Sequence, residues 1–221
     1  MTVPTRSEGR LIACPEGGII VRRLWTLVAT GVCLLGAATP ARAQGAEASP
    51  VTVCLPCHGA GAAAAPAAPT FPTLNGQHAA YLEKQLREYK SGKRKSAVMA
   101  PLIGTLKKGQ IRAMAAHFAS QSPVRGTVES PELAARGKAL YEEGNRGTGV
   151  PACVGCHLAG AQGNPLYPRL AGQRQAYTVQ QLTEFKSGAR TNDRAHVMRA
   201  VAGRLSEEEI KAVAEYLAGL E

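Results

Sequence analysis

Two short cysteine motifs, each followed at once by a histidine, are the residues of this chain best suited to chemistry. They consist of Cys54, Cys57 and His58 in the first and Cys153, Cys156 and His157 in the second. In one helical turn, residues i, i+3 and i+4 point the same way, so each motif places two thiols and one imidazole on a single face. The thiols can add to the two vinyl groups at a haem edge while the imidazole reaches the iron. The doubled motif therefore predicts two covalently bound haem c groups.

Two other chemistries use paired cysteines. A zinc site needs four ligands on one metal, and two C-x-x-C pairs could supply them, but both adjacent histidines would then be unexplained. A thioredoxin-type redox pair expects a strand, a turn and a helix around the motif, and this context is missing. Haem attachment accounts for the cysteines and the histidines together.

A methionine follows each motif at the same distance. Met99 comes 41 residues after His58, and Met198 comes 41 residues after His157. Both precede the final predicted helix of their unit, in stretches that we predict to be loops, whereas Met114 lies on an apolar helical face and is predicted as core. We predict Met99 and Met198 as the sixth ligands of the two irons. Such ligation leaves no open position for a substrate and suits electron transfer.

The remaining histidines do not recur in the second copy, so His78, His117 and His196 are predicted to have surface or packing roles. Two prolines do recur. Pro72 and Pro168 are candidates to offer a backbone carbonyl to the N–H of the iron-binding imidazole, although an ordinary turn proline explains them equally well.

The motifs belong to an internal repeat, which organises the exported part of the chain. The segment 71–77 returns as 167–173, and both copies contain P-x-L-x-G-Q. Further on, the pattern K-S-G-x-R at 90–94 returns at 186–190. One unit used twice predicts two domains of the same fold.

The elements that must position these residues are helices. We predict helices over Ala79–Ser91 and Ala176–Ser187, each ended by a glycine, and an opening helix of the second unit over Leu133–Glu143. In the first unit, Ala46–Val53 is interrupted by Pro50, so its opening helix is predicted to be short or absent.

Apolar residues at i, i+3, i+4 and i+7 predict the last helix of each unit. They are Ile111, Met114, Ala115 and Phe118 in the first unit and Ile210, Val213, Ala214 and Leu217 in the second. Ser206 and Glu209 are spaced as a capping box. With no convincing strand pattern, the predicted fold class is all-α, with tandem helical domains that each surround one haem.

The N-terminal residues 1–43 are typical of a secretory leader. An apolar run, Leu24–Ala38, follows two arginines and precedes the A-x-A pattern at 41–43. The run is shorter than the ~20 residues of a membrane span, and an uncleaved anchor is the alternative. Translation from Val21 instead of Met1 would give a more ordinary leader. Cleavage after Ala43 predicts a periplasmic protein with domain 1 at 44–122, a linker at 123–130 and domain 2 at 131–221.

Charge is distributed unevenly in a chain whose formal net charge is +10. Residues 44–124 hold nine basic and three acidic side chains, against twelve and eleven in residues 125–221. The basic group of domain 1 consists of Lys90, Lys93, Arg94, Lys95, Lys107 and Lys108. It is either a solvated face or a surface that steers the protein to an acidic partner. Nucleic-acid binding is not expected, because no recognition module is present.

Taken together, the two C-x-x-C-H motifs, the P-x-L-x-G-Q segments, the K-S-G-x-R ends and the repeated methionine resemble the dihaem cytochrome c4 family. The resemblance implies two class I cytochrome c folds with their haems facing across the domain interface. It also implies a periplasmic carrier, soluble or loosely membrane-associated, that hands electrons toward a terminal oxidase, with a membrane cytochrome complex or the oxidase as its redox partner. Cys54, Cys57, His58 and Met99 would serve the first haem, and Cys153, Cys156, His157 and Met198 the second. The chain departs from the pattern in its short first helix and in the alanine-rich loop 60–69.

Two other functions share much of this pattern. One is the dihaem subunit of a flavocytochrome complex that oxidises sulfide. The other is a dihaem peroxidase, which would need a five-coordinate iron and therefore one absent or labile methionine ligand.

Overall fold

The computed structural model describes residues 50–59 and 70–221, which belong to one compact unit, Gly45–Glu221. The predicted leader, the first half of the segment Ala46–Val53 and the loop 60–69 lie outside the described residues. The described secondary structure is helical, apart from turns and one antiparallel bridge between Asn145 and Val150. This confirms the all-α fold class. None of the described helices combines the length and the apolar character needed to cross a membrane.

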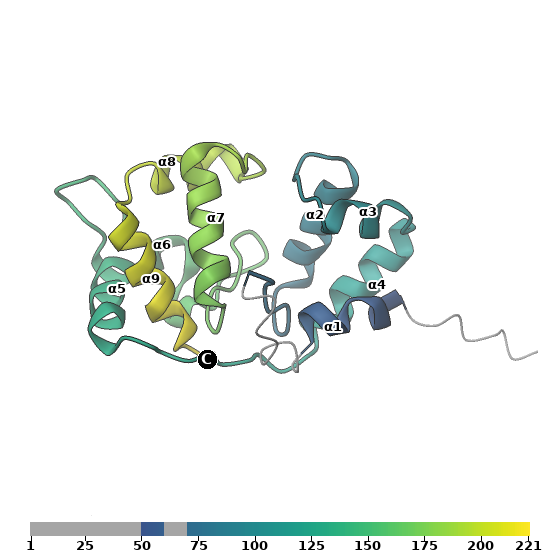
Figure 1. Cartoon of the computed structure of the whole chain (residues 1–221), viewed down its shortest axis with the longest axis horizontal. Coiled ribbons are helices and arrows are strands. Elements are labelled where there is room, and N and C mark those ends of the chain that lie inside the picture. Colours follow the sequence, from purple (N-terminus) through teal and green to yellow (C-terminus); the bar gives the residue numbers. More distant parts are fainter. Residues whose placement is uncertain (1–49, 60–69) are drawn as a thin grey trace, which may run out of the picture. The chain divides into compact units, whose positions relative to one another are not determined.

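The first domain packs its helices around an apolar core, and Figure 1 shows how these helices are arranged. Its elements are the 3-10 helix η1 (Pro50–Val53) and the helices α1 (Leu55–His58), α2 (Ala79–Lys90), α3 (Met99–Gly104) and α4 (Lys108–Ala119). Helix α2 packs against both α3 and α4. The core consists of Val51, Leu82, Ile103, Ile111, Met114, Ala115 and Phe118. The predicted apolar stripe of α4 is therefore confirmed, with Met114 as a core residue.

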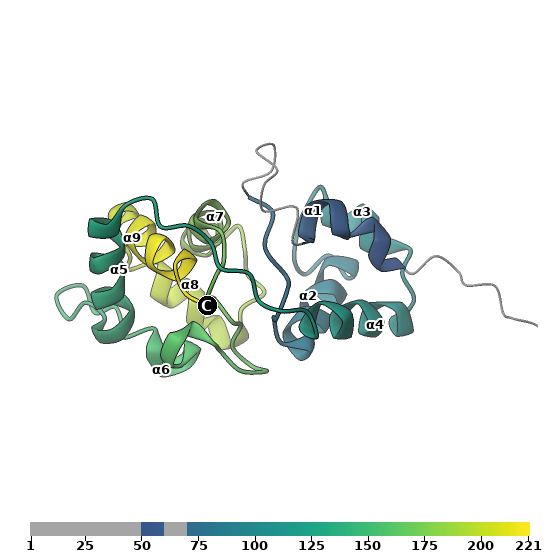
Figure 2. The same ribbon diagram turned by 90° about the horizontal axis from the view of Figure 1, so that it is seen from below.

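The second domain repeats this arrangement and adds an opening helix. Its elements are α5 (Pro131–Glu143), α6 (Val154–His157), η3 (Ala159–Ala161), α7 (Gln175–Ser187), η4 (Arg194–His196), α8 (Val197–Ala202) and α9 (Glu207–Ala218). Figures 1 and 2 both show α5 beside α9, and this pair makes the most extensive helix contact of the described residues. The predicted stripe of α9 is buried at all four positions.

Helix ends follow the sequence signals closely. The predicted helices 79–91 and 176–187 are confirmed to within a residue by α2 and α7, and Gly188 ends α7 with a left-handed φ of 76°. The predicted capping box opens α9: the Ser206 N–H donates to Glu209 Oε2 at 2.8 Å, and the Glu209 N–H donates to Ser206 Oγ at 3.1 Å. These caps satisfy amide groups that the helix itself leaves without partners.

The two domains differ most where the chain enters them. In domain 2, α5 crosses α9, whereas in domain 1 the described residues before the cysteine motif form only η1, which packs against α4. Close approach of α5 to α9 depends on Gly137, which is buried in α5. A Cβ atom at this position would lie 1.9 Å from the Ala212 carbonyl oxygen of α9.

We expect Gly137→Ala to destabilise the protein by about 1–3 kcal/mol, because the two helices must separate to admit the methyl group. Helix propensity alone would predict the opposite sign, since alanine is favoured over glycine by up to ~1 kcal/mol inside a helix. Denaturant unfolding of the haem-loaded protein measures the difference. Gly109→Ala in α4 is the matched control, because a Cβ there meets nothing within 4 Å. Equal stability of Gly137→Ala and the wild type would contradict the packing argument.

Candidate functional site

Both cysteine motifs and both predicted methionine ligands line one cavity of about 950 Å³ within the compact unit. Its walls are mainly apolar side chains, including Leu82, Ile103 and Leu217. Among the described histidines, only His58 and His157 line it. An apolar cavity with a few convergent thiols, imidazoles and thioethers suits a large flat hydrophobic cofactor that contains a metal.

Each cysteine motif forms one short helical turn. Cys54 is the N-cap of α1 and Cys153 the N-cap of α6. In both, the histidine N–H donates to the carbonyl of the first cysteine at 2.9 Å, which closes the turn. No disulfide joins the four cysteines of the described residues. Burial raises the pKa of the Cys54 thiol, and it raises the pKa of Cys153 to about 11, so both are neutral thiols at pH 7.

The two imidazoles are fixed in one tautomer. His58 Nδ1 donates to the Pro72 carbonyl at 2.9 Å, and His157 Nδ1 donates to the Pro168 carbonyl at 3.0 Å. The prediction that these prolines accept from the histidines is therefore confirmed. Since Nδ1 carries the hydrogen, Nε2 keeps its lone pair for a metal. Burial also lowers the pKa of both histidines and so favours the neutral form.

The methionines lie at helix starts and not in loops, so that part of the prediction is wrong. Met99 is the first residue of α3, and its N–H donates to Ser96 Oγ at 3.0 Å. Met198 lies in the first turn of α8. Their sequence neighbourhood reads as irregular because each helix has only six residues, too few for an amphipathic period to be recognised.

Backbone strain accompanies the approach to Met198. Ala195 and His196 both have left-handed φ angles, of 48° and 63°, which cost energy for residues with a Cβ atom. The Asp193 carboxylate holds this turn by accepting from the Arg199 N–H at 3.1 Å and from Arg199 Nε at 2.8 Å. His196 is exposed, in line with its predicted surface or packing role.

One buried arginine of domain 2 has unused hydrogen-bonding capacity. Arg169 follows Pro168, is 8% exposed and lines the cavity. Its Nε and Nη2 atoms are buried and have no hydrogen-bond partner among the described residues. A buried guanidinium needs an anion, and the propionate carboxylates of a haem are anions that this cavity would receive. The residues present therefore fit the cofactor that the motifs predict.

Two further arginines, Arg94 and Arg190, make symmetrical hydrogen bonds between the domains. Arg94 donates to Gln85 of its own domain at 2.8 Å and to Tyr177 and Gln181 of domain 2 at 3.0 and 2.7 Å. Arg190 donates to Gln181 of its own domain at 2.8 Å. Across the interface, Arg190 also donates to Tyr81 and Gln85, at 3.2 and 3.1 Å. Both arginines and both glutamines are buried.

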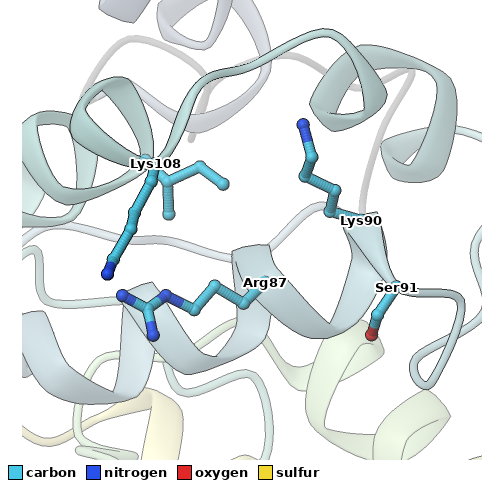
Figure 3. A pocket seen from close by; sticks show the side chains of 5 residues that line it. Arg87, Lys90, Ser91 and Lys108 are labelled. Carbon is cyan, nitrogen blue, oxygen red and sulfur yellow. The ribbon is translucent and has the colours of Figure 1, made fainter.

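The basic group of domain 1 therefore needs a correction. Arg94 is 6% exposed and belongs to the interface, not to the solvated surface. The five lysines of the group are exposed. Beside them, α2 and the start of α4 form a surface hollow of about 260 Å³, and Figure 3 shows the side chains of Arg87, Lys90, Ser91 and Lys108 around it.

The zinc alternative finds no support in the geometry. Among the described residues, no group of three or more histidine, cysteine or acidic side chains is close enough to hold a metal ion. Two other histidines lie outside the cavity and contact other residues of the chain. His78 bonds the Gln162 carbonyl at 2.9 Å, and the His117 ring packs edge-on against Phe118.

Comparison with known proteins decides the family. The Cytochrome c family model matches residues 43–122 and 134–221. Cytochrome c4 from Thiocapsa roseopersicina is 43% identical over 180 residues, which cover 80% of this chain and 92% of that protein. The chain belongs to the cytochrome c4 family. It is accordingly a dihaem c-type electron-transfer cytochrome that binds two haem c groups covalently.

The fold agrees with this assignment. The crystal structure of reduced recombinant cytochrome c4 from Pseudomonas stutzeri superimposes with a TM-score of 0.71 at 40% identity, covering 77% of this chain and 95% of that one. A more distant relative has a name that refers to a sulfur-oxidising enzyme. It is the thiosulfate dehydrogenase electron acceptor of Thiomonas intermedia, 34% identical over 90% of this chain and 92% of that protein.

Sequence reasoning missed the polar residues between the domains. Arg94 and Arg190 belong to the repeated K-S-G-x-R pattern, and Gln85 and Gln181 are repeat-equivalent as well, but the repeat did not identify them as partners across an interface. Their recurrence in both copies was the available signal, because polar residues that recur at equivalent positions can have a shared structural role. Asn192 and Glu88 gave no such signal, since they form a bond without a repeat-equivalent: Asn192 Nδ2 donates to Glu88 Oε2 at 2.6 Å.

Glu88 of domain 1 bonds Asn192 of domain 2, and its contribution to stability depends on pH. Burial raises its pKa, but hydrogen bonds from Lys84 and Asn192 outweigh this, so the pKa lies below its usual value. A depressed carboxylate pKa stabilises the folded state above the unfolded value of about 4.3, and this contribution is lost as the pH falls through the folded pKa.

We therefore expect Glu88→Gln to cost about 1–3 kcal/mol at pH 7 and progressively less as the pH is lowered below about 4. Denaturant unfolding of both proteins between pH 7 and pH 3 measures the difference. Glu184→Gln is the matched control, because Glu184 is the repeat-equivalent residue and accepts from Gln180 of its own helix. A Glu88→Gln deficit that stays constant over this pH range would contradict the assignment.

Proposed function

We propose that this cytochrome is exported to the periplasm and carries single electrons between respiratory partners, toward a terminal oxidase. The leader-like residues 1–43 support the location. The observation on which the proposal chiefly rests is that both neutral imidazoles, both repeated methionines and both cysteine pairs line one apolar cavity. Such a site has two ligands for an iron and keeps none of its positions for a substrate.

The residue assignments follow from the repeat. Cys54 and Cys57 would hold the first haem through thioethers, and Cys153 and Cys156 the second. His58 with Met99, and His157 with Met198, would complete the axial positions of the two irons. Each haem supplies one-electron chemistry between ferrous and ferric iron.

The protein's own contribution is to keep the ligands still during electron transfer. Each imidazole is held by its proline carbonyl and contacts an aromatic ring: Phe71 lies 6.2 Å from His58 and Tyr167 lies 6.1 Å from His157, between ring centroids. Fixed ligands limit the rearrangement that accompanies a change of iron charge, and the buried apolar walls exclude water.

The unfavourable position of two lysines supports a basic docking surface on domain 1. Lys107 and Lys108 lie at the N-terminus of α4, the positive end of the helix dipole, where cations are unfavourable. The corresponding start of α9 in domain 2 has Ser206 followed by three glutamates. The fold therefore accepts acidic residues at this position, and two lysines at an unfavourable position support a role in recognising an acidic partner.

A second candidate function concerns the electron donor. The relative in Thiomonas intermedia is named as an electron acceptor of thiosulfate dehydrogenase, so a sulfur-oxidising enzyme is a candidate donor to this protein. In the flavocytochrome alternative, the chain would itself be the dihaem subunit of a complex that oxidises sulfide, so its electrons would likewise come from a sulfur compound. Reduction of the purified protein by thiosulfate in the presence of such an enzyme, compared with reduction by a membrane quinol-oxidising complex, distinguishes the two donors.

We expect the exported protein to begin at residue 44 and to have the mass of the polypeptide plus two haems.

Met99→Ala and Met198→Ala should each remove about half of the near-infrared band that methionine-ligated ferric haem gives, because each deprives one iron of its sulfur ligand. Mass spectrometry and optical spectroscopy provide the measurements. Met114→Leu is the control, since Met114 is core and its replacement should leave the band unchanged. A mass without added porphyrin would contradict the proposal.

For the docking surface, we expect the double variant Lys107→Ser with Lys108→Glu to slow electron delivery to an acidic partner at low salt, by roughly tenfold. The difference should vanish at high salt, because screening removes the steering. The same variant should be more stable by about 1 kcal/mol, since it gains an N-cap and loses a cation at the helix start. Stopped-flow kinetics and denaturant unfolding measure the two effects. A rate that does not depend on salt in the wild type would contradict steering.

A further inference from the structure

The peptide group between Pro72 and Thr73 connects the two domains at the iron-binding histidine. Its carbonyl accepts from His58 Nδ1 at 2.9 Å, and its N–H donates to Gln173 Oε1 at 3.0 Å. Gln173 belongs to domain 2. One peptide group therefore separates the imidazole of the first site from a side chain of the second domain.

The same arrangement exists in the opposite direction. The carbonyl of the peptide group between Pro168 and Arg169 accepts from His157 Nδ1 at 3.0 Å, and its N–H donates to Gln77 Oε1 at 2.9 Å. Gln77 belongs to domain 1. The two glutamines end the two P-x-L-x-G-Q segments, so each segment supplies both a peptide group for its own histidine and a glutamine for the other.

Both glutamine side chains are fixed by a second hydrogen bond. Gln173 Nε2 donates to the Thr73 carbonyl at 3.0 Å, and Gln77 Nε2 donates to the Arg169 carbonyl at 2.8 Å. Each amide thus pairs with the N–H and the C=O of a single residue in the opposite domain. The glutamines are 7% and 8% exposed, so water does not compete freely for these bonds.

Hydrogen bonds that share a peptide group strengthen one another. When the N–H of a peptide donates, its carbonyl oxygen becomes more negative and accepts more strongly. A stronger acceptor at Nδ1 gives the imidazole more anionic character and makes it a more basic ligand. A more basic ligand favours ferric over ferrous iron and lowers the reduction potential.

We propose that Gln77 and Gln173 are crossed tuning residues: each sets the reduction potential of the haem in the other domain through the peptide group that accepts from its histidine. This inference rests on the proposed ligation by His58 and His157. Gln173 acts on the first haem and Gln77 on the second. Both are positioning residues, since neither touches the iron ligands themselves. Each glutamine acts through a peptide group on a histidine of the opposite domain, so contact between the domains adjusts the reduction potentials of both haems.

The test uses the full haem-loaded protein and the single variants Gln173→Met and Gln77→Met, which keep the side chain's length and remove its acceptor. We expect Gln173→Met to shift the ferric–ferrous equilibrium of the His58 haem toward ferrous iron by roughly two- to tenfold at a fixed potential, and to leave the other haem nearly unchanged. Gln77→Met should do the same to the His157 haem.

The readout must resolve the two haems. Potentiometric titration followed by the proton NMR signals of the haem methyl groups gives one midpoint for each haem, and Met99→His and Met198→His assign the signals. Gln173→Glu provides a change of opposite sign, because a carboxylate accepts more strongly from the Thr73 N–H and should favour ferric iron in the His58 haem. His78→Ala is the control, since it removes a bond between the domains, to the Gln162 carbonyl, that does not reach a proline carbonyl.

The crossed pattern is the deciding result. Equal shifts of both haems in each variant, or a larger shift in the haem of the mutated domain, would overturn the proposal, as would shifts of the same size in His78→Ala. Failure of the proposed function is visible separately, because the wild-type protein would then lack two haems with methionine ligation before any variant is compared.

Discussion

Everything at the two sites depends on a hydrogen bond from each iron-binding imidazole to a proline carbonyl. The bond decides which nitrogen carries the hydrogen, and it leaves the other nitrogen with a lone pair for a metal. A free histidine exchanges between two tautomers and rotates about two torsions. Here the cysteine turn fixes the backbone of the histidine and the proline segment fixes its ring. Two segments far apart along the chain must therefore meet before a site exists.

The two proline segments also make hydrogen bonds between the domains. These bonds belong to an interface that is mainly polar. The arginine pair Arg94 and Arg190, the glutamines and the tyrosines form a buried network in which each domain completes the hydrogen bonds of the other. Burying such groups is costly unless their partners are in place, so the network favours one relative arrangement over nearby alternatives. The residues that join the domains thereby also reach the environment of the iron ligands.

Duplication explains the symmetry of the interface, and divergence explains what distinguishes the domains. Position 73 is a threonine whereas position 169 is an arginine with unpaired buried nitrogens. Helix α4 starts with lysines whereas α9 starts with a capping serine and glutamates. The glycine contact between α5 and α9 has no counterpart in the described part of domain 1. Two copies of one fold can thus present different haem environments and different surfaces to their partners.

The sequence alone determined the chemistry and most of the helices. Covalent haem attachment was predictable because it needs two thiols and an imidazole at a spacing set by a single helical turn, and local spacing is what a sequence records. The stripes of α4 and α9 and the cap at Ser206 were predictable for the same reason. Pro72 and Pro168 could be suspected only because they recur.

Only the tertiary structure decided which side chains meet. Arg94 reads as one more cation in a basic run, but it is buried, because its guanidinium finds Gln181 and Tyr177 on a helix more than eighty residues away. Asn192, Glu88 and the unpaired nitrogens of Arg169 likewise gain meaning from neighbours that no local pattern specifies. The physical reason is that the net effect of a buried polar group depends on whether its partners are present, and those partners are brought together by packing of the whole unit.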